Sequence, residues 1–303
     1  MSEVVYVDRR SGERVTESVM GDRALRFAYE TLAGRTLWPV LFGSKLMSAL
    51  MGAYYDSPRS RKAIAALAAI PGCRADEAAR PLAEYGSFNE FFTRRLKPGA
   101  RPVGDGFVSP ADGRLRLYSG ASVERPFPLK GAVRSLRQVF APGRTADLPS
   151  AVDIAVIRLA PVDYHRFHFP CDTKIVGEVA VIPGKYHSVN PIALVRYPDV
   201  YADNERQIVE GEAGFGRYWT VDVGAFGVGT VVQSWQAEGR REWRKGEERG
   251  YFKFGGSTVI VITAAGALEW DADLVRNSAA GLETRVLCGE RLAVARAHGQ
   301  RDL

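Results

Sequence analysis

Cysteine is scarce in this chain of 303 residues, with only three, at Cys73, Cys171 and Cys288. A sparse, odd number argues against the disulfide framework of a small secreted protein and favours a reducing compartment. No apolar run reaches the roughly 18 residues that a membrane-spanning helix needs, and the first residues lack the apolar core of a signal peptide. We therefore expect a chain that neither spans a membrane nor carries a secretion signal.

Neither sign of charge dominates the composition. The chain has 41 Lys and Arg against 35 Asp and Glu, a formal net charge of +6, and 46% of its residues are hydrophobic. These values are typical of globular proteins and exclude a disordered, collagenous or coiled-coil chain. The mild basic excess permits contact with anionic lipid or nucleic acid but requires neither.

The chain is predicted to be helical first and β-rich afterwards. Residues from about 20 to 97 have helical patterns, whereas strand-like patterns begin at about 106, after a join rich in Pro and Gly. The fold class is therefore α+β, with an N-terminal helical region, 1–105, that associates with a membrane interface, and a β-rich catalytic domain, 106–303. The clearest strands are expected at 152–159, 220–223, 229–233, 257–263 and 283–288.

Three helices are expected in the first region. Residues 37–55 are the most apolar stretch, and they are typical either of a helix lying in a membrane interface or of a helix packed on the core. A second helix is expected at 61–70, after an N-terminal cap around Pro58. A third begins at Ser87, where Glu90 completes a capping box, and continues to Leu96. The basic residues that follow are either a solvated face or a contact for anionic headgroups; they are Arg94, Arg95, Lys97 and Arg101.

Three short clusters contain the residue types that carry chemistry. They are Ser109-Pro-Ala-Asp-Gly113, the segment 161–171 with two of the four histidines, and Phe254-Gly-Gly-Ser-Thr258. Taken singly, the first is typical of a hairpin turn and the last of a glycine turn. His165, His168 and Cys171 are also possible zinc ligands, but no second Cys or His pair lies nearby, so we predict no metal.

Taken together, the clusters contain the parts of an activated nucleophile. A Ser, a His and an Asp that are distant in sequence form such a group in many folds. Ser257 follows two glycines, and Gly256 has no side chain that would shield its carbonyl from attack. The residues alone thus leave open that Ser257 attacks the peptide bond before it.

The order of these motifs resembles that of the phosphatidylserine decarboxylases, pyruvoyl enzymes that make phosphatidylethanolamine. The resemblance extends over nearly the whole chain. The motif Phe254-Gly-Gly-Ser-Thr258 is similar to the form of the same motif in bacterial members of about 300 residues. Six segments in the family's order carry it: Phe88 to Pro102, Ser109 to Gly113, Asp163 to Pro170, Asn204 to Arg206, Val223 to Ala225 and Lys245 to Thr258.

The resemblance implies self-cleavage between Gly256 and Ser257. The products would be a β chain, 1–256, and an α chain, 257–303, whose N-terminal Ser257 becomes the pyruvoyl group. His168 would be the base that takes the Ser257 proton, and Asp112 would hold His168 in a charge relay.

The resemblance also implies the second reaction. The pyruvoyl group would form a Schiff base with the amine of phosphatidylserine, release CO2 and give phosphatidylethanolamine. His165 is the candidate proton donor. Tyr164, Arg166 and Asp163 would hold the histidines, although Arg166 is alternatively a contact for lipid phosphate.

Phosphatidylserine lies in a bilayer, which favours the interfacial interpretation of residues 20–70. We therefore expect a peripheral protein on the cytoplasmic side of the cell membrane, in contact with an anionic lipid surface and not with nucleic acid. A homodimer is expected by resemblance alone. Two other hypotheses remain open: a pyruvoyl decarboxylase of a soluble amine, and a lipid-binding module without enzyme activity.

Overall fold

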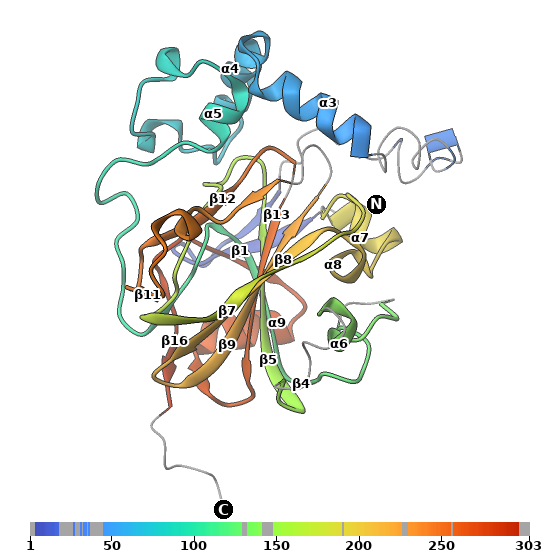
Figure 1. Cartoon of the computed structure of the whole chain (residues 1–303), viewed down its shortest axis with the longest axis vertical. Helices are drawn as coiled ribbons and strands as arrows, with labels where there is room; N and C mark the ends of the chain where they lie inside the picture. Colours follow the sequence, from blue (N-terminus) through green and yellow to red (C-terminus); the bar gives the residue numbers. More distant parts are fainter. Residues whose placement is uncertain are drawn as a thin grey trace, which may run out of the picture.

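A computed structural model describes residues 4–17, 27, 31, 33–34, 36, 45–128, 132–140, 148–189, 191–225, 230–255 and 257–296. Its centre is a ten-stranded sheet (Figure 1). From one edge to the other the strands are β11 (Glu242–Trp243), β7 (Thr173–Ile182), β8 (Arg206–Ala213), β9 (Gly216–Gly224), β13 (Ser257–Ala264), β5 (Ala151–Leu159), β4 (Gly113–Ser122), β15 (Glu283–Val286), β1 (Val5–Asp8) and β2 (Arg14–Thr16).

The sheet has a hydrophobic core on each face, and β13 contributes to both. Val259 and Val261 belong to one core, whereas Ile260 and Ile262 belong to the other. Successive side chains of a strand point to opposite faces, so this continuous β-branched run is buried on both sides. The expected strands around it are confirmed, including the one at 152–159 that pairs with β13 along its whole length.

Short helices and two small sheets cover these faces. One core includes residues of α6 (Leu136–Val139) and α8 (Val200–Asp203), near α7 (Pro191–Arg196). The other lies under α9 (Ala272–Ala279) and two three-stranded sheets. These sheets are β10 (Val231–Val232), β12 (Glu248–Phe252) and β6 (Arg166–His168), and then β14 (Leu268–Trp270), β16 (Arg291–Ala295) and β3 (Phe107–Val108).

The expected helices form a separate layer at one end of the sheet, at the top of Figure 1. They are α3 (Lys45–Asp56), α4 (Lys62–Ala68) and α5 (Phe88–Phe92), and three short 3-10 turns accompany them, η1 (Pro58–Arg61), η2 (Ala75–Glu77) and η3 (Leu82–Glu84). Most of residues 18–44 lies outside the described part. No helix of that part is long and apolar enough to cross a membrane.

Helix α5 begins as predicted and ends earlier. The Ser87 side chain accepts from the Glu90 amide, and the Glu90 carboxylate accepts from the Gly86 amide. The helix stops at Phe92 and not at Leu96, because the next residues turn to pair with another segment. Leu96 forms a β-bridge with Ala78. A local capping signal cannot reveal that distant partner.

The N-terminal residues and the segment 109–113 differ from what their local patterns alone indicate. Residues 5–16 lie in the region predicted to be helical, but they form β1 and β2, and β1 pairs in parallel with β15 near the other end of the chain. The segment 109–113 is not a hairpin turn, because β3 pairs with β16 while β4 pairs with β5 and β15. In both cases the partner strand is far away in sequence.

A buried ion-pair network ties the N-terminal strands to the centre of the sheet. Glu17, just after β2, accepts two hydrogen bonds from Arg158 of β5, at 3.1 and 2.6 Å. The Arg158 guanidinium also binds Glu283 of β15, and Arg114 lies 3.9 Å from Glu17. Burial alone would raise the pKa of Glu17, but the two arginine cations hold it below its usual value.

We expect Glu17→Gln to lower the free energy of unfolding by up to about 3–5 kcal/mol, because it removes one of the two carboxylates that bind the buried Arg158 and leaves its charge only partly compensated. Urea unfolding at pH 7 measures this difference. Glu13→Gln is the matched control, since Glu13 is exposed in the same N-terminal segment. Equal unfolding midpoints for the two variants would show that the network contributes nothing to stability.

Candidate active site

Asp112 lies in the buried loop between β3 and β4, where an arginine holds its carboxylate. Arg101 donates to both carboxylate oxygens, at 2.8 and 2.6 Å, and the Cys288 amide donates to one of them at 2.8 Å. Arg101 also binds Glu77 at 2.7 Å. A bidentate arginine pair of this kind is strong and fixes the plane of the carboxylate.

His168, in β6, lies beside the same loop because its amide donates to the Pro110 carbonyl. Its Nδ1 is 2.9 Å from the Gly246 carbonyl oxygen, and its Nε2 is 3.1 Å from the Tyr164 hydroxyl. A carbonyl oxygen only accepts, so Nδ1 carries the hydrogen and Nε2 accepts from Tyr164. Burial lowers the pKa of His168, which makes it a neutral base with its lone pair on Nε2.

The predicted hydrogen bond between Asp112 and His168 is not formed between these described residues. Arg101 and Cys288 bind the carboxylate, while Gly246 and Tyr164 bind the two ring nitrogens. Asp112 still favours the protonated form of His168 through space, which partly offsets the effect of burial on its pKa. The backbone carbonyl of Gly246 therefore sets the tautomer that the sequence analysis assigned to Asp112.

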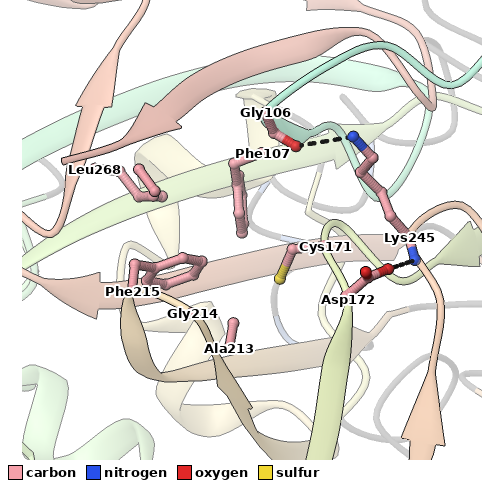
Figure 2. A pocket seen from close by; sticks show the side chains of 10 residues that line it. Gly106, Phe107, Cys171, Asp172, Ala213, Gly214, Phe215, Lys245 and Leu268 are labelled. Carbon is pink, nitrogen blue, oxygen red and sulfur yellow. Dashed lines mark hydrogen bonds between the residues drawn. The ribbon is translucent and has the colours of Figure 1, made fainter. Parts of the chain in front are cut away.

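The turn that carries this carbonyl is tethered on several sides. The Lys245 ammonium donates to the Gly104 and Gly106 carbonyls, and its amide donates to Asp172. Figure 2 shows Lys245 bridging these segments at the edge of a mostly apolar cavity of about 280 Å³. Gly246 has φ +83°, and a Cβ there would lie 2.5 Å from Val103, so only glycine fits. The position of its carbonyl is thus fixed by packing.

Ser257 is the first residue of β13, between Leu159 of β5 and Gly224 of β9. It is fully buried, and its Oγ has no hydrogen-bond partner among the described residues. A buried hydroxyl without a partner is costly and calls for a functional explanation. Gly256, the other half of the predicted cleavage site, lies outside the described residues.

His165 is fully buried, and one of its nitrogens lacks a partner among the described residues. Its Nδ1 lies 3.0 Å from the Asp163 carbonyl oxygen and so carries a hydrogen, whereas Nε2 has no partner in the described part of the chain. The ring lies on Phe92 of α5, with centroids 3.8 Å apart. Burial, together with the nearby cations Arg94 and Arg114, lowers the pKa of His165 to about 3.

Asp163 and Arg166 bind groups of the protein. The Asp163 carboxylate accepts from Arg114 and from the Ala160 amide, and burial raises its pKa. Arg166 donates to the Thr93 carbonyl at 2.9 Å and to Glu248 at 2.7 Å. Asp163 thus orients His165 through its backbone, and the Arg166 guanidinium is already engaged.

The four basic residues after α5 do not share one solvated face. Arg95 and Lys97 are exposed, but Arg94 is buried against the Phe91 ring and Arg101 binds Asp112. Within the described ranges, no group of three or more His, Cys, Asp or Glu side chains could hold a metal ion. Sequence reasoning missed Arg101 and Gly246 as partners, although both lie in motifs that it singled out.

Comparison with known proteins identifies the family of this chain. The family described as phosphatidylserine decarboxylase matches residues 88–294. Curated proteins named phosphatidylserine decarboxylase proenzyme are similar over nearly their full length. The protein from Chlamydia caviae is 35% identical over 296 residues, covering 96% of this chain and 98% of its own. The protein from Ruminiclostridium cellulolyticum is 36% identical over 289 residues, covering 94% and 95%. The chain therefore belongs to the phosphatidylserine decarboxylase family.

Proposed function

We propose that this chain is the precursor of a phosphatidylserine decarboxylase, which cuts itself between Gly256 and Ser257 and then converts phosphatidylserine to phosphatidylethanolamine. The observation that carries the proposal is the buried, unpartnered hydroxyl of Ser257 at the head of the central strand. Two neutral histidines in the adjoining loop and strand supply lone pairs for proton transfer.

In the self-cleavage, His168 is the base and Ser257 the nucleophile. The Gly256 acyl group moves from the Ser257 nitrogen to Oγ, elimination leaves a Gly256 carboxylate and dehydroalanine, and water then releases ammonia to give the pyruvoyl group. Nε2 of His168 is the basic atom, and it already accepts a hydrogen bond from the Tyr164 hydroxyl. The Tyr164 hydroxyl must therefore turn aside or pass the proton on. Asp112 stabilises the charged imidazole electrostatically, across space.

In the decarboxylation, the pyruvoyl group supplies a carbonyl that takes the substrate amine and accepts the electrons left when CO2 departs. A phospholipid amine arrives as an ammonium ion and has to lose a proton before it reacts. Nε2 of His165 has no hydrogen-bond partner among the described residues and can receive a proton, but the low pKa makes His165 a weak base that holds it only briefly. The low pKa of His165 then favours returning the proton to the carbon that CO2 has left. His165 is thus the candidate proton donor of the decarboxylation.

The substrate requires this protein to reach a bilayer, and the exposed side chains of α3 support that. Leu50 and Tyr54 are 58% and 41% exposed, whereas Tyr55 packs inward against Phe88. This exposed face lies in the same helical layer as α5, which covers His165. The proposal includes peripheral binding at the cytoplasmic face of the cell membrane. The α and β chains come from one precursor, and the homodimer stays a prediction from the resemblance.

Intact-mass measurement tests the origin of the cofactor. The wild-type chain of 33.2 kDa should yield species of about 28 and about 5 kDa, the smaller blocked at its N-terminus. Ser257→Ala should remain one chain without decarboxylase activity, and Ser119→Ala, at an exposed position of β4, should behave as wild type. An active, cut Ser257→Ala protein would refute the proposal, whereas activity on free serine but not on lipid vesicles would favour the soluble-amine hypothesis.

The two histidines should separate the two reactions. We expect His168→Ala to block or greatly slow cleavage, because Ser257 then loses its base. His165→Ala should be cut normally but release CO2 about 10²–10⁴-fold more slowly, the usual contribution of a general acid or base. Gel analysis and CO2 release from phosphatidylserine vesicles measure these outcomes. Failure of both variants to cut would show that the division of roles is wrong.

The protonation state of His165 can be measured directly. In the Ser257→Ala precursor, NMR should show His165 as the Nδ1–H tautomer and neutral from pH 8 down to about pH 4, since its pKa is lowered to about 3. The unfolded chain takes up a proton near the ordinary pKa of 6.5, so stability should fall as the pH drops below that value. His165→Gln identifies the signal. A titration midpoint near 6.5 would show that burial does not lower the pKa of His165 and would contradict its role as a ready proton donor.

A further inference from the structure

The residues just before the predicted cleavage site are held by the helical layer as well as by the segment before β10, where the Thr230 carbonyl accepts from the Lys253 amide. Strand β12 ends at Phe252, and β13 begins at Ser257. Between them, the Phe254 amide donates to the side-chain oxygen of Asn89 in α5, at 2.9 Å. Asn89 therefore supplies an acceptor at a point where the main sheet supplies none to this amide.

Asn89 is itself fixed from the other side. Its amide nitrogen donates to Asp56, the last residue of α3, at 3.0 Å, and its side chain is buried. The second carboxylate oxygen of Asp56 binds the Lys253 ammonium at 2.9 Å. Two consecutive residues, Lys253 and Phe254, are thus tethered to the same point between α3 and α5. The amide side chain of Asn89 accepts from Phe254 with its oxygen and donates to Asp56 with its nitrogen.

The Phe254 ring adds an apolar anchor to these polar contacts. It makes edge-to-face contacts with Tyr55, Phe88 and Phe92, at centroid distances of 4.5, 4.9 and 5.2 Å. Such aromatic pairs have a preferred geometry and restrict the position of the ring. The Phe92 ring also lies on His165. One aromatic cluster therefore positions both the chain entering the cleavage site and the second histidine.

From these contacts we infer that Asn89 is a positioning residue for self-cleavage, which sets the path of the chain into the Gly256–Ser257 bond. The inference rests on the proposed function, because it supposes that this bond is cut. Ser257 is fixed by two neighbouring strands, so the approach of the Gly256 carbonyl depends on how the preceding residues are held. Intramolecular attack is very sensitive to this geometry, and a displacement of about 1 Å can cost about 10²-fold in rate.

The experiment measures the rate at which newly synthesised full-length chain is cut, by pulse-chase in cell-free translation. We expect Asn89→Leu and Asn89→Asp to slow cleavage by about 10–10²-fold. The first loses both hydrogen bonds, and the second places two carboxylates together. Glu90→Gln is the matched control, because Glu90 is the next residue, is half exposed and binds Gly86 and Arg80 instead.

An exchange of the two side chains separates positioning from a loss of folding. In the double variant Asn89→Asp with Asp56→Asn, residue 89 still accepts from Phe254, and the hydrogen bond to residue 56 is restored with donor and acceptor reversed. We expect it to recover most of the cleavage rate. Melting of each variant in the Ser257→Ala background checks that the chain is folded.

The outcomes distinguish this inference from the proposed function. An uncut wild-type chain would refute the proposed function itself. A cut wild type together with Asn89→Leu cut at the same rate would overturn only the role of Asn89. A double variant as slow as Asn89→Asp would likewise overturn it, because the reversed hydrogen bond would then not matter.

Discussion

The fixed position of Ser257 at the head of β13 is the constraint on which the rest of the site depends. In most enzymes the reacting group is a side chain on a continuous backbone. Here the reacting pyruvoyl group is proposed to form from Ser257 at a break in the backbone. Strand β13 is paired with β5 and β9 from its first residue and buried on both faces. The sheet therefore holds the residue after the cut, while α3 and α5 hold the residues before it. This division allows the chain to break without loss of the fold.

The proposed α chain has 303 − 256 = 47 residues and contributes strands to two sheets. It contains β13 in the centre of the main sheet, β15 next to β4 and β1, and the β14–β16 pair. Separation of the two chains would expose both hydrophobic cores, since β13 belongs to each. The hydrophobic effect therefore keeps the cleaved chains together without a covalent link.

Arginines bind the buried carboxylates around the site, whereas burial is the main reason that the histidines stay neutral. Asp112 pairs with Arg101, Asp163 with Arg114, and Glu17 with Arg158. The histidine nitrogens that carry hydrogen donate to backbone carbonyls. A carboxylate bonded directly to an imidazole would raise the histidine pKa, whereas a carbonyl fixes the tautomer with less effect on charge. Both histidines are therefore available as bases inside a dry site.

The strand expected at 257–263 is confirmed, because a β-branched run is visible in the sequence. The roles of Asp112, His165, His168 and Ser257 came from the resemblance in motif order, and they stay predictions. The partners of these residues were less predictable. The Gly246 and Asp163 carbonyls are backbone atoms, which have no residue signature, and Arg101 was indistinguishable from its basic neighbours until its contact with Asp112 was seen. The N-terminal strands were not predicted for a related reason, because β1 pairs with residues 283–285, which are distant in sequence.

The helical layer has a part in the chemistry besides any contact with lipid. Phe92 of α5 forms one wall of His165, and Tyr55 of α3 contacts the Phe254 ring before the cleavage site. The same α3 presents Leu50 and Tyr54 to the outside. Under the proposed function, a lipid that reaches this end of the molecule meets the helices that also position the reacting chain. Membrane contact and maturation then depend on the same helical layer. This explains why aromatic side chains, in addition to charge and an amphipathic pattern, connect α3 to the residues before β13.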